Sequence, residues 1–114
     1  MGLTPPYFAV IFSSVRSASG NDDYATTARR MEELAAGMPG FLGIESARGE
    51  NNFGITVSYW RDEASIAHWR QHLEHLEAQQ RGKREWYEHY VLRVAKVERA
   101  YSGPHGRQAI FYAS

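Results

Sequence analysis

The chain has 114 residues, and its 13 basic residues balance 13 acidic ones, so its formal net charge is zero. Such a balance provides no field that would attract nucleic acid or an anionic membrane, and neither is expected as a partner. The absence of cysteine excludes disulfides, thiolate zinc sites, iron–sulfur clusters and thiol nucleophiles. Length and composition, with 43% hydrophobic and 23% charged residues, are typical of one soluble globular domain.

The beginning of the chain shows no membrane or export signal. Its longest apolar run, from Tyr7 to Phe12, is too short to span a membrane, and no basic segment precedes it. We therefore expect a cytoplasmic protein. We expect residues 1–101 to form a single domain and residues 102–114 to form a tail or an arm.

The first half of the chain predicts a strand followed by a helix. Residues 7–15 are rich in β-branched and aromatic side chains, and Pro5-Pro6 before them disfavours a helical start. From about Asp22, apolar residues recur at spacings of three and four, as in an amphipathic helix. They are Tyr24, Ala28, Met31, Leu34, Ala35 and Met38. Pro39 ends this helix because proline cannot donate a helical hydrogen bond.

Two strands are predicted next, at residues 41–48 and 53–60. The polar segment between them, residues 49–52, has the length and composition of a hairpin loop. Alternation along the second strand predicts that one face carries Phe53, Ile55, Val57 and Tyr59 and the other Gly54, Thr56, Ser58 and Trp60. We expect one of these faces to pack on the helices.

A second helix and a last strand complete the pattern. Asp62 suits the N-cap of the helix, and the apolar stripe that follows consists of Ile66, Trp69, Leu73 and Leu76. The helical pattern weakens near Gln79, after which we expect a short helical turn over residues 83–86. The last strand is predicted over residues 87–101.

The predicted order of elements, βαββαβ, fits an α+β, ferredoxin-like fold in which two helices cover one face of a four-stranded antiparallel sheet. The other face is then uncovered, and a broad apolar face in water marks an interaction site. We therefore expect a homodimer in which two sheets pack face to face. In the last strand, alternation places Val91, Arg93, Ala95 and Val97 on one face and Leu92 and Val94 on the other. We expect whichever set faces away from the helices to contact the partner.

The second helix carries His68, His72 and His75, within reach of one another on its surface. An i, i+4 pair of histidines can chelate a metal, but the three alternate with polar residues on the flank of the apolar stripe, as on a solvated helix face. The sequence contains no HExxH motif. We predict no metal site.

Aromatic residues gather in the second half of the chain, where core filling is their commonest use. They are Tyr59, Trp60, Trp69, Trp86, Tyr87 and Tyr90. A flat ligand stacked among them, with His72 as a polar neighbour, is the alternative. Phosphate-binding motifs of the GxGxxG and GxxxxGK[ST] types are absent, as is GxSxG. Nucleotide cofactors and triad hydrolysis are therefore disfavoured.

Several segments resemble one known family when they are taken together: residues 38–45 (MPGFLGIE), 58–60 (SYW), 66–70 (IAHWR), 75–79 (HLEAQ), 86–87 (WY) and 93–99 (RVAKVER). The chain resembles the antibiotic biosynthesis monooxygenase family, and its small uncharacterised bacterial branch most closely. The likeness extends over residues 7–101. It implies a dimeric α+β barrel of ferredoxin-like subunits.

The resemblance also implies an activity. Members of the family oxygenate polycyclic aromatic phenols without a cofactor, because the electron-rich substrate itself activates O₂. Relatives degrade haem with an asparagine near the end of the first strand, a helix tryptophan and a histidine ten residues later. This chain matches only Trp69, because residues 12–15 contain no asparagine and position 79 is Gln79. Haem degradation is therefore the less favoured alternative. The cofactor-free oxygenases have an asparagine one turn before that tryptophan, where this chain has Ser65.

We therefore expect a cofactor-independent monooxygenase acting on a small aromatic or quinol-like substrate between the sheet and the second helix. His72 is the candidate base, because an imidazole titrates near pH 6.5, and Arg93 would hold the substrate anion. The candidate substrate-binding residues are Trp69, Tyr59, Trp60, Trp86 and Tyr90. Packing and surface roles are the alternatives for these side chains. A second function class is a non-enzymatic dimeric module that binds a small hydrophobic ligand.

Overall fold

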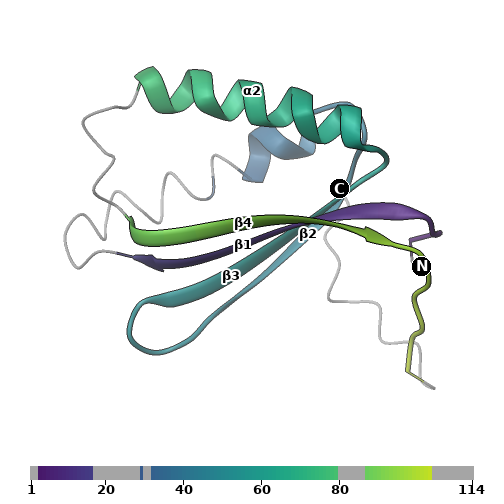
Figure 1. Cartoon of the computed structure of the whole chain (residues 1–114), viewed down its shortest axis with the longest axis horizontal. Helices are drawn as coiled ribbons and strands as arrows, with labels where there is room; N and C mark the ends of the chain where they lie inside the picture. The colour runs from purple at the N-terminus through teal and green to yellow at the C-terminus, as the bar shows by residue number, and fades with distance from the viewer. Residues whose placement is uncertain (1–2, 17–28, 30–31, 80–86, 104–114) are drawn as a thin grey trace.

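The computed structural model describes residues 3–16, 29, 32–79 and 87–103 (Figure 1). Its elements are β1 (Tyr7–Arg16), β2 (Phe41–Arg48), β3 (Phe53–Trp60), α2 (Glu63–Gln79) and β4 (Tyr87–Val97). Residues 32–36 are helical as well, and they belong to the first predicted helix, whose beginning lies outside the described residues. The predicted helical turn over residues 83–86 lies outside them too. The strands and the second helix confirm the predicted order.

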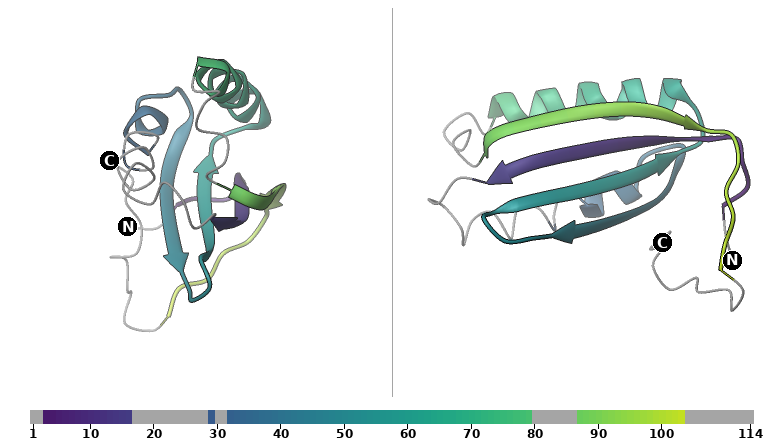
Figure 2. Two further views of the ribbon diagram at one scale, coloured as in Figure 1. Left: turned by 90° about the vertical axis from the view of Figure 1, so that its left-hand side faces the viewer. Right: turned by 60° about the horizontal axis from the view of Figure 1, so that its bottom comes forward.

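The four strands form one antiparallel sheet in the order β2-β3-β1-β4. β1 and β3 are therefore central, whereas β2 and β4 are the two edges. Both the helical residues 32–36 and α2 lie on the same side of the sheet (Figures 1 and 2). This arrangement is the ferredoxin-like α+β fold, as predicted.

The strand registers decide which side each residue faces. Phe8 pairs with Trp60 and Val10 with Ser58, and these residues lie on the side that carries α2, here called the helix side. The alternate residues form the opposite side, here called the outer face. The outer face comprises Tyr7, Ala9, Ile11, Ser13 and Val15 of β1, Gly43, Glu45 and Ala47 of β2, Phe53, Ile55, Val57 and Tyr59 of β3, and His89, Val91, Arg93, Ala95 and Val97 of β4.

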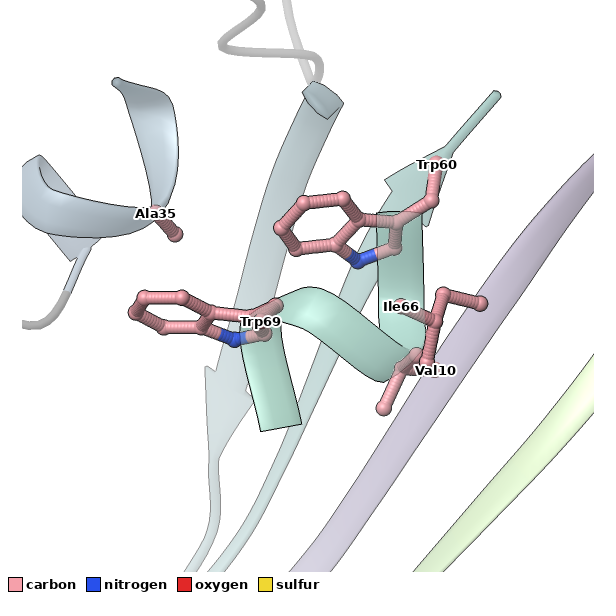
Figure 3. Packing of buried hydrophobic residues seen from close by; sticks show 5 residues of the cluster. All are labelled: Val10, Ala35, Trp60, Ile66 and Trp69. Atoms are coloured by element: carbon pink, nitrogen blue, oxygen red, sulfur yellow. The ribbon is translucent and has the colours of Figure 1, made fainter. Parts of the chain in front are cut away.

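The core lies on the helix side, between β1, β3, α2 and the first helix (Figure 3). Trp60 is fully buried at 0% exposure, and Val10, Ala35, Ile66 and Trp69 surround it. Burial of each larger apolar side chain stabilises the fold by about 1.5–3 kcal/mol. The Trp60 indole Nε1 donates to Ser58 Oγ at 2.9 Å, so its polar group keeps a partner inside the core.

A capped junction fixes the start of α2. Asp62 Oδ1 accepts hydrogen bonds from the Ser65 backbone N at 2.8 Å and from Ser65 Oγ at 2.7 Å, which confirms the predicted N-cap. These bonds, from the side chain first and then the backbone of Ser65, lower the pKa of Asp62. Gly40 has a φ of 85°, and a Cβ there would lie 2.0 Å from Ser65 Oγ. Only glycine therefore fits at this close approach between the turn before β2 and the first turn of α2.

Backbone conformation explains the turn between β2 and β3, and backbone pairing explains where β4 ends. Asn51 and Asn52 adopt positive φ, and Phe53 N donates to Glu50 O at 3.3 Å, as in the type I′ turns that suit twisted hairpins. β4 pairs with β1 only as far as Val97 opposite Tyr7. The strand predicted to residue 101 is therefore shorter, because β1 offers no partner beyond Tyr7.

Residues 98–103 continue β4 as an exposed segment. This segment runs away from the side that carries α2 (Figures 1 and 2), and Tyr101 within it is 88% exposed. The predicted tail from residue 104 onward lies outside the described residues. In the part of the chain that the structure describes, no helix is long and apolar enough to cross a membrane.

Candidate functional site

A stack of aromatic rings leads from the core to the flank of α2. The rings of Trp60 and Trp69 lie 6.1 Å apart with an interplanar angle of 26°, and those of Trp69 and His72 lie 5.5 Å apart at 29°. Trp69 and His72 are three residues apart on the helix, so successive turns place them side by side. Trp60 is fully buried, Trp69 is 7% exposed and His72 is half-buried. The imidazole is thus the accessible end of the stack.

Apolar side chains of β4 are exposed on the helix side, although α2 lies on that side. Tyr90, Leu92 and Val94, here called the β4 strip, are 52%, 38% and 46% exposed. They pair with Ser14, Phe12 and Val10 of β1, which places them on the helix side. α2 and the first helix therefore cover the half of the sheet around Trp60, whereas the β4 half stays exposed. The ring of Phe12 lies 5.4 Å from that of Tyr90 and extends the strip toward the centre of the sheet.

The β4 strip and the accessible end of the aromatic stack form the candidate site. The strip offers apolar and aromatic surface, and His72 offers an imidazole that can donate or accept a hydrogen bond. Such a combination of apolar surface with few polar groups is typical of sites for small hydrophobic molecules.

The structure divides the predicted substrate-binding residues. Trp69, Tyr90 and Trp60 are all on the helix side, but Trp60 is enclosed in the core and offers no surface to a ligand. Tyr59 is on the outer face because successive residues of a strand point to opposite sides. Trp86 lies outside the described residues.

The two predicted catalytic residues lie on opposite sides of the sheet. His72 stacks on Trp69 on the helix side, whereas Arg93 pairs with Ile11 and belongs to the outer face. A single protomer therefore does not combine them in one pocket. The sequence separated the two faces of β4, but only the register with β1 shows which one carries Arg93.

Tyr59 has a partner that the sequence analysis missed. Its hydroxyl donates to Glu45 Oε2 at 2.5 Å, and the ring of Tyr7 lies edge-on at 5.7 Å. Burial, and then the hydrogen bond to Glu45, raise the pKa of Tyr59. The hairpin register, which pairs Tyr59 with Gly43 and Val57 with Glu45, is the signal that could have identified this contact.

The histidines of α2 differ in their surroundings. His68 is exposed, whereas His72 is half-buried against Trp69; the side chain of His75 lies outside the description. Within the described part of the chain, no group of three or more His, Cys, Asp or Glu side chains is placed to hold a metal ion.

The chain matches the antibiotic biosynthesis monooxygenase family over residues 6–81. It belongs to the antibiotic biosynthesis monooxygenase family. This family member is 56% identical over 95 residues to the uncharacterized protein YqjZ of Bacillus subtilis (strain 168), a match that covers 83% of this chain and 82% of that protein. The resemblance identified from the sequence is thereby confirmed.

Two further proteins are similar to this family member. It is 36% identical over 94 residues to a protein of Pyricularia oryzae named jasmonate monooxygenase ABM, a match that covers 79% of this chain but only 43% of that protein. The crystal structure of PA3566 from Pseudomonas aeruginosa has a TM-score of 0.65 at 15% identity, covering 88% of this chain and 100% of that chain. This likeness shows a shared fold.

Proposed function

We propose that the protein is a cofactor-independent monooxygenase of a small aromatic or quinol-like substrate, bound between α2 and the β4 strip. Membership of the family supports monooxygenase chemistry, and a relative is named a monooxygenase of jasmonate. The observation that carries the proposal is the β4 strip, where apolar side chains remain 38–52% exposed on the side of the sheet that carries the Trp69–His72 stack.

Binding and proton transfer are divided between the two parts of the site. The β4 strip removes apolar substrate surface from water, which contributes about 25 cal/mol per Å² of buried area. His72 takes the weakly acidic proton of the substrate, and such general-base assistance is worth about 10²- to 10⁴-fold in rate. Stacking against Trp69 holds the imidazole ring in place for this step. The electron-rich substrate anion then reacts with O₂.

The electrons for this reaction come from the substrate alone. In a ketone whose methylene lies between two aromatic rings, as in an anthrone, the methylene becomes a carbonyl. One atom of O₂ becomes the new carbonyl oxygen, and the other leaves as water with the two methylene hydrogens. The substrate supplies all four electrons, so the protein needs to bind it, orient it and move a proton.

Aerobic incubation of the purified protein with anthrones and naphthoquinols tests the proposal. Oxygen uptake is expected, with one atom of ¹⁸O₂ in the product. His72→Ala should lower kcat/KM by about 10²-fold or more, whereas His68→Ala, an exposed histidine one turn earlier on the same helix, should retain activity. Thermal stabilisation by these compounds without oxygen uptake would instead indicate a binding module, and equal activity of both variants would exclude His72 as the base.

A second variant tests the location of the site. Leu92→Gln places an amide in the β4 strip and should raise KM more than it lowers kcat, because it weakens apolar binding and leaves His72 intact. Ala67→Gln on the exposed flank of α2 is the control. An unchanged KM in Leu92→Gln would place the substrate elsewhere.

A further inference from the structure

Two tryptophan rings lead from the candidate site into the core. The indoles of Trp69 and Trp60 are stacked, with ring centroids 6.1 Å apart and an interplanar angle of 26° (Figure 3). Trp69 is 7% exposed and stacks on His72, whereas Trp60 is fully buried. Indole and phenol are the side-chain groups of this cysteine-free chain that give up one electron most easily. Stacked rings at this distance are in contact, and an electron passes readily between aromatic rings in contact.

Next to Trp60 in the chain stands a tyrosine that has a proton acceptor. Tyr59 precedes Trp60 in β3, so their Cα atoms lie about 3.8 Å apart, although their side chains point to opposite faces. The Tyr59 hydroxyl donates to Glu45 Oε2 at 2.5 Å. Tyr7, which is buried at 5% exposure, lies edge-on against the Tyr59 ring at 5.7 Å. Tyr59 is therefore a half-buried phenol that an aromatic ring shields and a carboxylate accompanies.

The hydrogen bond from Tyr59 to Glu45 provides a path for a proton. Burial, and then this hydrogen bond, raise the pKa of Tyr59, so the hydroxyl keeps its proton at neutral pH. A phenol that has lost one electron is a strong acid, whereas an ionised carboxylate has lone pairs that accept a proton. Oxidation of Tyr59 would therefore move its proton to Glu45 along a bond that already exists. The neutral phenoxyl that remains is more stable than an oxidised indole, so the oxidised state moves from tryptophan to tyrosine.

We propose that Trp69, Trp60 and Tyr59 form an electron-transfer chain that supplies one electron to a substrate peroxyl radical on the helix side. The oxidised group then lies on the outer face as a Tyr59 phenoxyl, with its proton on Glu45. The identity of the oxidant rests on the proposed monooxygenase function. A peroxyl radical forms when the substrate anion loses an electron to O₂, the superoxide escapes, and a second O₂ adds to the substrate radical. Such a turnover lacks one electron, and the chain provides it.

The electrons and protons of this step balance. The peroxyl radical takes one electron from Trp69 and one proton from water, and it becomes a hydroperoxide. Trp60 refills Trp69 and Tyr59 refills Trp60, so both indoles return to their starting state. The hydroperoxide then loses water as its C–H and O–O bonds break, which gives the carbonyl product. A reductant of the ascorbate class later returns one electron to the phenoxyl, and Glu45 returns the proton.

The chain also removes the oxidised group from the site. The sheet separates Tyr59 on the outer face from the β4 strip on the helix side. An oxidised Trp69 would instead remain beside His72, where superoxide and peroxides are formed and can add to the indole. Transfer to Tyr59 therefore protects the aromatic stack that the proposed site depends on.

Pulse radiolysis tests the chain without a substrate. The chain has three tryptophans, so Trp86→Phe gives a parent protein in which Trp60 and Trp69 are the indoles. Azide radicals oxidise indoles in preference to phenols at neutral pH. The indolyl absorption should decay as the phenoxyl absorption rises, at a rate independent of protein concentration. Tyr59→Phe should lose most of the phenoxyl signal and keep the indolyl radical several-fold longer. Tyr101→Phe, which removes an 88% exposed phenol, is the control and should match the parent.

Two further variants test the route and the proton. Trp60→Phe keeps an aromatic ring in the core and should slow phenoxyl formation several-fold, because the indole between Trp69 and Tyr59 is lost. Glu45→Gln keeps a hydrogen-bond acceptor but takes up no proton, and it should slow phenoxyl formation as well. Circular dichroism checks that each variant is folded.

Three results would overturn the proposal. They are the parent rate and yield of phenoxyl in Tyr59→Phe, the parent rate in both Trp60→Phe and Glu45→Gln, and a rate that increases with protein concentration. Because azide radicals replace the natural oxidant, none of these results depends on oxygen uptake. A failure to oxygenate any substrate would exclude the substrate peroxyl as the oxidant and would leave the measured transfer intact.

Discussion

The helix side and the outer face of the sheet are built from the same four strands, yet they expose different chemistry. On the helix side, α2 and the first helix together enclose Trp60, whereas the β4 strip remains 38–52% exposed. On the outer face, Phe53 and Ile55 of β3 remain 43% and 36% exposed, whereas Tyr7 and Ala9 of β1 are buried. Glu45 and Arg93 lie on the two edge strands of that face. The difference shows that the helices cover only part of one face of the sheet, so apolar strand residues remain exposed on both faces.

The largest expected effect comes from removing the Trp60 side chain from the core on the helix side. Trp60→Ala should lower the free energy of unfolding by about 3–5 kcal/mol, because the fully buried indole leaves a cavity. Urea denaturation measures the loss. Tyr101→Ala, at 88% exposure, should change the stability by less than about 0.5 kcal/mol. Equal losses in the two variants would contradict the described difference in burial.

A smaller effect is expected at the junction that holds α2 over the sheet. Gly40→Ala should cost about 1–3 kcal/mol, because the positive φ is strained for alanine and its Cβ would overlap Ser65. Gly103→Ala has no neighbouring atom within 4 Å of its Cβ and should be close to neutral. Thermal denaturation of both variants measures the difference. A Gly40→Ala protein as stable as the control would contradict the close approach at Ser65.

The outer face should respond to the loss of one hydrogen bond. Tyr59→Phe should cost about 0.5–1.5 kcal/mol, since Glu45 loses its donor. Because the folded-state pKa of Tyr59 is raised, its contribution is present below the ordinary tyrosine pKa and is lost as the pH rises beyond it. Urea denaturation at fixed protein concentration, repeated from neutral to alkaline pH, measures both effects. If the phenylalanine variant lost stability at alkaline pH as steeply as the native chain, Tyr59 would not be the group responsible.

The smallest expected effect is the titration of the helix cap. The folded-state pKa of Asp62 is lowered, so its contribution is present above the ordinary aspartate pKa and is lost as the pH falls through the folded-state pKa. Asp62→Asn keeps a capping side chain but removes this titration. Its denaturation midpoint should therefore change less than that of the native chain between neutral pH and about pH 3. Parallel pH profiles would show that Asp62 does not contribute to acid sensitivity.

Local patterns predicted most of the fold. The period of two in the strands, the period of about four in α2 and the Asp62 cap all depend on residues close in sequence. For the candidate site, the proximity of Trp69 and His72 could be predicted, because the two residues are one turn apart on a helix. The positions of Tyr59 and Arg93 relative to them could not be predicted, because each depends on which side of the sheet receives the helices.

The sequence by itself determined which residues of each strand share a face, because side-chain alternation is a property of a single strand. Tertiary structure alone decided that the face with Trp60 is covered and that α2 leaves the β4 half open, since both depend on where the helices pack. The pairing of strands distant in sequence also placed Glu45 and Arg93 at the same level of the sheet, through the paired residues Val57 and Ile11. Residues 45 and 93 are brought to one level by three strand registers, and no local pattern contains that information.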